Sequence, residues 1–129
     1  MLVVIDTNVL VSAFWSRNGN CAQISALMVN RKIIPCYDYR IMEEYIQVLS
    51  RPKFGFEQWE IDAFLSQLRH DGISVLAKTI DMPFVDESDR KFYEVARHCD
   101  ARLITGNSGH FPDDGLAIPP VAFLAGYKF

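Results

Sequence analysis

The sequence predicts an α/β fold: a single three-layer domain in which helices cover both faces of a mainly parallel, twisted sheet. Short apolar runs that are rich in β-branched residues, such as Leu2–Ile5, alternate along the chain with longer segments of helical period. Hydrophobic residues make up 50% of the chain and the net charge of −3 is modest, so disorder is not expected. The 129 residues suffice for one core but not for two ordinary domains, so residues 1–129 are expected to form one unit.

Five segments have the character of strands. The first is a continuous apolar run, as expected for a strand that is buried on both faces of a sheet. Gly106 ends the fourth segment, and the fifth is short enough to lie at a sheet edge. The predicted strands are residues 2–5, 32–36, 73–77, 102–105 and 115–118.

The remaining segments have helical period and helix-terminal residues. Asn8 and Asp38 are N-cap candidates, and Pro52 ends the helix that Asp38 begins. Asp71 with Gly72 ends the next helix, and a proline pair begins the last one. The other predicted helices cover residues 9–14, 21–29, 57–70, 87–99 and 119–125.

The composition excludes several classes of protein. No apolar stretch approaches the length of a membrane span, and Asp6 interrupts the first apolar run too early for a signal peptide, so we expect a cytoplasmic protein without membrane contact. Three widely spaced cysteines fit neither a disulfide framework nor paired zinc ligands. The acidic balance excludes a general nucleic-acid coat but allows an enzyme with a local basic rim, for which Arg90 and Lys91 are candidates.

Asp6 is the first candidate for a functional residue, because it directly follows the first predicted strand. In parallel α/β sheets, ligands bind just beyond the carboxyl ends of the strands. A lone buried carboxylate is costly unless something compensates its charge. Asp6 therefore either caps the following helix or ligates a metal ion, and the second interpretation requires more acids at the same edge.

More acids are expected at that edge from two helices. On a helical wheel Glu44 lies at the margin of the apolar stripe and Glu43 does not, so Glu44 is the more plausible inward acid; a solvated glutamate is the alternative. Asp86 and Asp89 have the spacing of an N-cap and its third helical position, so a capping box would account for both. The helix dipole would also keep these carboxylates ionised and available as ligands.

Four short segments follow one another along the chain: Asp6 in "VVIDTNVLVSA", Glu44 in "IMEEYIQVLSRPKF", Asp89 in "DESDRKFYEVA", and "ARLITGNSGHFP". Together they resemble the successive motifs of the PIN-domain nucleases. The likeness is greatest to the PIN-family toxin components of toxin–antitoxin pairs, and it extends from Val3 to about Leu124.

The resemblance implies a compact α/β/α fold and a metal-dependent ribonuclease that binds Mg²⁺ or Mn²⁺ through clustered acids. By position, Asp6, Glu44 and Asp89 match the first three acids of the family, and Asp86 matches an additional aspartate of the subgroup. The implied partners are an RNA substrate, a protein antitoxin and a second copy of the chain in a homodimer.

The fourth acidic position departs from the family pattern. Many members have an aspartate after "TG", where this chain has Asn107. An asparagine carbonyl can accept a water or touch a hard cation but adds no charge, so metal affinity should be weaker and one ion is favoured over two. The resemblance also assigns Thr7 and Asn8 to steadying Asp6, and Thr105 to the hydroxyl position that precedes Asn107.

These assignments give a hypothesis for the site. Asp6 and Asp89 ligate the ion, Glu44 binds it directly or through water, and Asn107 orients a water or the substrate. His110 is interpreted as a hydrogen-bonded spacer rather than a general base. The candidate catalytic residues are Asp6, Glu44, Asp89 and Asn107, and the candidate metal ligands are Asp6, Glu44, Asp86 and Asp89.

Three other functions stay open at this point. A phosphatase of the haloacid-dehalogenase type also places an aspartate after its first strand, but it needs a second aspartate where this chain has Asn8. A receiver-type phosphorylation module needs a lysine after a late strand, and none follows Thr105 in "TGN". A PIN fold without catalysis, which only binds partners, is kept open by Asn107. The aromatic-rich segment 54–68 belongs either to such a partner surface or to the core.

Overall fold

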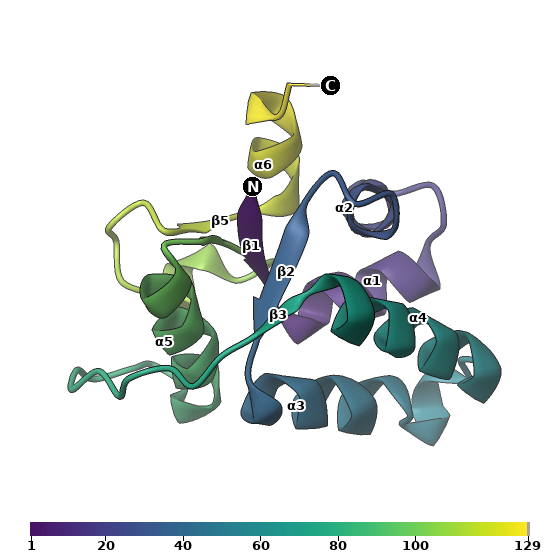
Figure 1. Ribbon diagram of the computed structural model, residues 1–129, viewed down its shortest axis with the longest axis horizontal. Helices are drawn as coiled ribbons and strands as arrows, with labels where there is room; N and C mark the ends of the chain where they lie inside the picture. Colours follow the sequence, from purple (N-terminus) through teal and green to yellow (C-terminus); the bar gives the residue numbers. More distant parts are fainter. Residues whose placement is uncertain (129) are drawn as a thin grey trace.

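Five parallel strands form a sheet in the order β3-β2-β1-β4-β5 (Figure 1). The computed structural model describes residues 1–128. Because β1 pairs with both β2 and β4, the first strand of the chain lies at the centre of the sheet. The strands are β1 (Leu2–Ile5), β2 (Ile34–Tyr37), β3 (Ile73–Ser74), β4 (Arg102–Ile104) and β5 (Ala117–Ile118).

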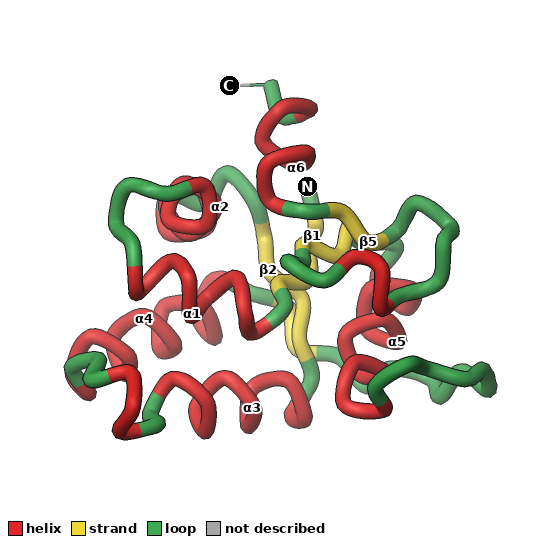
Figure 2. The backbone as a smooth tube through the Cα atoms, turned by 180° about the vertical axis from the view of Figure 1, so that it is seen from behind, coloured by secondary structure: helices red, strands yellow, loops and turns green. Residues whose placement is uncertain are grey.

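Helices lie on both sides of this sheet. Their bounds are α1 (Thr7–Trp15), α2 (Asn20–Val29), α3 (Tyr39–Leu49), α4 (Gln58–Asp71), α5 (Arg90–Cys99) and α6 (Pro120–Gly126), with short 3₁₀ helices η1 (Pro52–Phe54), η2 (Glu87–Asp89) and η3 (Ser108–His110). α5 lies on one side of β1 and β2, and α1, α2 and α4 lie on the other in two opposite views (Figures 1 and 2). The predicted three-layer α/β architecture is therefore confirmed. No helix within residues 1–128 is both long and apolar enough to cross a membrane.

The core is centred on β1 and on the inward faces of α3 and α5. Val3, Val4 and Ile5 are fully buried, as the continuous apolar run predicts for a central parallel strand. Tyr45 of α3 and Tyr93 of α5 are among the largest fully buried side chains. Burial of each such side chain contributes roughly 1.5–3 kcal/mol, which holds both helices against the sheet.

The start of α1 differs from the prediction. The helix begins at Thr7 and its N-cap is Asp6, whose side chain makes no capping hydrogen bond. The predicted cap at Asn8 is wrong, because the Asn8 side chain accepts a hydrogen bond from the Gly106 backbone N–H at 3.1 Å. Asn8 thus ties the start of α1 to the loop that follows β4. The predicted Asp38 cap of α3 is confirmed by its hydrogen bond from the Ile41 N–H at 3.0 Å.

β3 is shorter than the sequence predicts. It ends at Ser74, whereas the prediction extended to residue 77. Residues 75–86 contain no helix or strand and run away from the sheet before the chain enters η2 (Figure 1). The predicted helix 87–99 is also divided, because its first turn is the 3₁₀ helix η2.

Gly72 gives a test of this packing, since two backbone segments converge on it between α4 and β3. A Cβ atom there would lie 2.6 Å from the Leu68 carbonyl oxygen and 2.7 Å from the Pro35 carbonyl oxygen. We expect Gly72→Ala to lower the free energy of unfolding by about 1–3 kcal/mol, because the backbone must shift. Gly109→Ala is the matched control, since a Cβ at Gly109 meets nothing within 4 Å. Equal urea-unfolding midpoints for Gly72→Ala and Gly109→Ala would contradict the close approach of the Leu68 and Pro35 carbonyl oxygens to Gly72.

Candidate active site

Three elements bring carboxylates to the carboxyl edge of the sheet. Asp6 directly follows β1, and Glu44 lies in the second turn of α3, which follows β2. Asp89 precedes α5, whose first residues lie at this edge because α5 leads back into β4. The charges of Asp89 and Glu44 both raise the pKa of Asp6, so the three carboxylates are close enough to interact. The structure thus places the three acids that the sequence predicts at this edge within electrostatic range of one another.

Asp6 is buried and is held by hydroxyl and amide groups. Its side chain is 6% exposed, and its Oδ2 accepts a hydrogen bond from Thr105 Oγ1 at 2.7 Å. Asn8 Nδ2 lies 3.5 Å from the same oxygen. Burial raises the pKa of Asp6 to about 6, the Thr105 hydrogen bond opposes this rise, and the charges of Asp89 and Glu44 add to it. Asn8 therefore has the contact with Asp6 that the resemblance assigns to it, and Thr105 makes a hydrogen bond to Asp6 that the resemblance does not assign.

Glu44 points inward but is already engaged by two partners. Thr7 Oγ1 donates a hydrogen bond to Glu44 Oε2, so this threonine contacts the second acid rather than Asp6. Lys91 Nζ lies 2.9 Å from Glu44 Oε1. Glu43 is exposed, in agreement with the helical-wheel argument. The sequence placed Lys91 in a basic rim and missed its position within the acidic cluster.

Asp89 carries an unsatisfied oxygen. Within residues 1–128, its Oδ2 atom is buried and has no hydrogen-bond partner. His110 Nδ1 lies 3.6 Å from this oxygen, beyond hydrogen-bond distance. Burial raises the pKa of Asp89, the charge of Asp86 adds to this rise, and His110 and Lys91 oppose it. An unsatisfied buried carboxylate oxygen is uncommon in folded proteins and requires an explanation.

Asp86 and Asn107 lie near the three acids, but each makes its hydrogen bonds to other groups. Asp86 Oδ1 accepts hydrogen bonds from Ser88 N at 3.0 Å and Ser88 Oγ at 2.8 Å, and the Ser88 backbone bond is the main cause of its lowered pKa. The capping interpretation is therefore confirmed for Asp86, and its role as a metal ligand stays a prediction. Asn107 is exposed, and its backbone N–H donates to Thr105 Oγ1 at 3.0 Å. Its predicted role in orienting water or substrate also stays a prediction.

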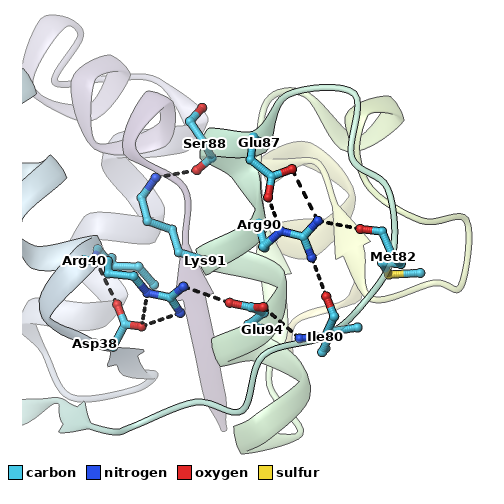
Figure 3. A network of polar contacts seen from close by, with 10 residues as sticks. Asp38, Arg40, Ile80, Met82, Glu87, Ser88, Arg90, Lys91 and Glu94 are labelled. Carbon is cyan, nitrogen blue, oxygen red and sulfur yellow. Dashed lines mark hydrogen bonds and ion pairs between the residues drawn. The ribbon is translucent and has the colours of Figure 1, made fainter.

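An ion-pair network with two buried acids, which sequence reasoning missed, joins α3, which carries Glu44, to α5, which follows Asp89. Arg40 Nε donates to Asp38 Oδ2 and Arg40 Nη1 donates to Glu94 Oε1, both at 2.8 Å (Figure 3). Glu94 is only 1% exposed. An acid on the buried face of "DRKFYEVA" was the available signal, because a buried glutamate requires a partner. The network fixes the start of α3 against the middle of α5.

The same network holds segment 75–86 through its backbone. Glu94 Oε2 accepts a hydrogen bond from the Ile80 N–H at 2.8 Å, and the Arg90 guanidinium donates to the carbonyl oxygens of Ile80 and Met82 (Figure 3). The Arg90 guanidinium also lies over the Phe84 ring, 4.8 Å from its centroid. Segment 75–86 is therefore held against α5 by Arg90, which directly follows Asp89, and by Glu94.

Only some of the residues at the carboxyl edge of the sheet are suited to hold a hydrated divalent ion. Within residues 1–128, no three histidine, cysteine, aspartate or glutamate side chains form a group that could hold a metal ion. Glu44 has both of its carboxylate oxygens in contact with Thr7 and Lys91. Asp6 and Asp89 are the remaining candidates, since Mg²⁺ keeps several waters and is commonly bound by one or two carboxylates. The unsatisfied Asp89 oxygen is an available hard ligand.

Asp6 should make the stability of the metal-free protein depend on pH. Burial raises its pKa from 3.8 to about 6, so the folded chain binds this proton more tightly than the unfolded chain. The resulting stabilisation is complete below the unfolded pKa and is lost as the pH rises through the folded one. Asp6→Asn keeps an acceptor for Thr105 without a charge. We therefore expect it to unfold at a higher urea concentration than the original chain at about pH 7, with a smaller advantage at about pH 4.

Unfolding in the presence of EDTA at both pH values measures this difference. Asp113→Asn, a substitution at an exposed aspartate, is the control and should shift neither midpoint. If Asp6→Asn is destabilised to the same extent at both pH values, burial does not raise the pKa of the Asp6 carboxylate as described above.

The comparison with known families agrees with this geometry. A family model for the PIN domain matches residues 2–108, a range that contains β1, α3 and α5 with Asp6, Glu44, Asp86 and Asp89. No curated protein matches the chain. The family match covers most of the sequence and includes the central strand and its buried aspartate, so the chain belongs to the PIN-domain family.

Proposed function

We propose that the protein is a cytoplasmic, metal-dependent endoribonuclease that uses Mg²⁺ or Mn²⁺. PIN domains are generally nucleases, and the chain has this domain over residues 2–108. The observation that carries the proposal is the buried Asp89 Oδ2, which has no hydrogen-bond partner within residues 1–128, together with the buried Asp6, whose pKa the charge of Asp89 raises. Two such carboxylates are costly without a cation, and a divalent ion would compensate both charges.

Each acid has a distinct task in this proposal. Asp6, oriented by the Thr105 hydroxyl, and Asp89, through its free oxygen, would hold the ion. Glu44 would bind it directly or through water after leaving its present partners, and Asn107 would orient a water or the substrate. The bound ion supplies a water of lowered pKa and stabilises the charge that develops on the phosphate oxygens.

A second candidate is a partner-binding PIN module without catalysis. The engagement of Glu44 by Lys91 and the neutral Asn107 favour it, since both reduce the negative charge available to a metal ion. Calorimetric titration with Mn²⁺ separates the two candidates. Binding that Asp6→Asn removes supports the nuclease, whereas no binding at millimolar Mn²⁺ supports the module.

The identity of the protein partners is proposed from the family resemblance. A small antitoxin and a second copy of the chain are the two candidates. Trp15 and Trp59 are exposed, and the Trp15 ring lies against Phe54 and Phe56 with centroid distances of 6.3 and 6.0 Å. This aromatic surface is the one we propose for a protein partner, since exposed aromatic clusters are typical of interfaces.

Cleavage assays test the nuclease directly. Asp6→Asn and Asp89→Asn should each reduce cleavage of single-stranded RNA by at least about a hundredfold, because each removes a ligand from the metal that activates water. EDTA should abolish cleavage by the original chain, and added Mn²⁺ should restore it.

Asp113→Asn, which lies outside the cluster, is the matched control and should cleave normally. Phosphate monoesters serve as the alternative substrate. Hydrolysis of monoesters without cleavage of RNA would support a phosphatase, and full RNA cleavage by Asp6→Asn would refute the assignment of the site.

A further inference from the structure

Lys91 extends from the first turn of α5 into the acidic cluster. Its Nζ atom lies 2.9 Å from Glu44 Oε1 and donates a hydrogen bond to the Ser88 carbonyl oxygen. Figure 3 shows the second of these contacts, from the end of the lysine to the turn that precedes α5. The Lys91 side chain is 13% exposed and that of Glu44 is 25% exposed, so this pair is largely shielded from water.

The charge of Lys91 acts on more than one acid. Besides contacting Glu44, it opposes the rise in the pKa of Asp89 and contributes to the lowered pKa of Asp86. A single ammonium group therefore lies within electrostatic range of three carboxylates. Exposed ion pairs are screened by water, but a shielded cation among several acids compensates a large part of their mutual repulsion.

We propose that Lys91 is an internal counter-ion of the acidic site, which neutralises Glu44 in the metal-free protein and opposes the binding of a divalent ion there. The metal-binding part of this inference rests on the proposed function. A divalent ion held by Asp6 and Asp89 would be repelled by the nearby ammonium group. It would gain Glu44 as a ligand only when that carboxylate leaves Lys91. With Asn107 neutral as well, the charge of the site suits one divalent ion.

Calorimetric titration with Mn²⁺ tests whether Lys91 opposes the binding of a divalent ion. Lys91→Met keeps the length and packing of the side chain and removes its charge, so we expect it to bind Mn²⁺ at least about tenfold more tightly than the original chain. Lys91→Arg retains the charge and should bind like the original chain. Lys32→Met, which changes an exposed lysine before β2 at the opposite edge of the sheet, is the matched control and should leave the affinity unchanged.

Thermal unfolding in EDTA tests whether Lys91 neutralises Glu44 in the metal-free protein. Lys91→Met should lower the melting temperature when Glu44 is present, because the carboxylate then loses its counter-ion. In the Glu44→Gln background the same substitution should lower the melting temperature less, since the carboxylate that Lys91 contacts directly is then absent and only Asp86 and Asp89 remain in its electrostatic range.

The outcomes separate this inference from the proposed function. If the original chain binds Mn²⁺ and Lys91→Met binds it equally or less tightly, the inference is overturned and the nuclease proposal stands. If Lys91→Met weakens RNA binding and leaves Mn²⁺ affinity unchanged, Lys91 is an RNA contact, which also overturns it. If neither the original chain nor Lys91→Met binds Mn²⁺, the proposed function is refuted, and so is the proposal that Lys91 opposes metal binding.

Discussion

A carboxylate buried at the end of the central strand is the constraint on which the arrangement of polar residues depends. Asp6 cannot be hydrated by bulk water, so protein groups must replace that hydration, and the Thr105 hydroxyl at 2.7 Å does so. The parallel sheet brings the loop after β4 beside the end of β1, which makes this contact between distant parts of the chain possible. Two more acids at the same edge increase the electrostatic cost, and Lys91 lies where it offsets part of it.

The relative position of α3 and α5 is the second condition for the site. Glu44 lies on α3 and Asp89 directly before α5, and the Asp38–Arg40–Glu94 network connects these two helices. Breaking one partner of such a network leaves an uncompensated charge in the interior, which is far more costly than losing an exposed ion pair. The acids thus depend on residues that do not contact a substrate.

The sequence predicted the parts of this structure that depend on local pattern and on sheet topology. Apolar runs located the strands, the end of the first of them located the buried Asp6 at the sheet edge, and the helical wheel distinguished Glu44 from Glu43. The pairings of Lys91 and Glu94 could not be predicted, because they depend on how two helices far apart in the chain pack together. Local rules also failed for the Asn8 cap, since its side chain bonds instead to the backbone after β4.

The way in which segment 75–86 is fastened has an evolutionary consequence. Arg90 and Glu94 contact main-chain atoms of Ile80 and Met82, groups that almost every amino acid provides. Side chains in this segment, such as the exposed Leu76 and Val85, can therefore be exchanged without loosening its attachment. Substitutions at these exposed positions should therefore be tolerated more readily than substitutions of Arg90 and Glu94, whose side chains make the attachment.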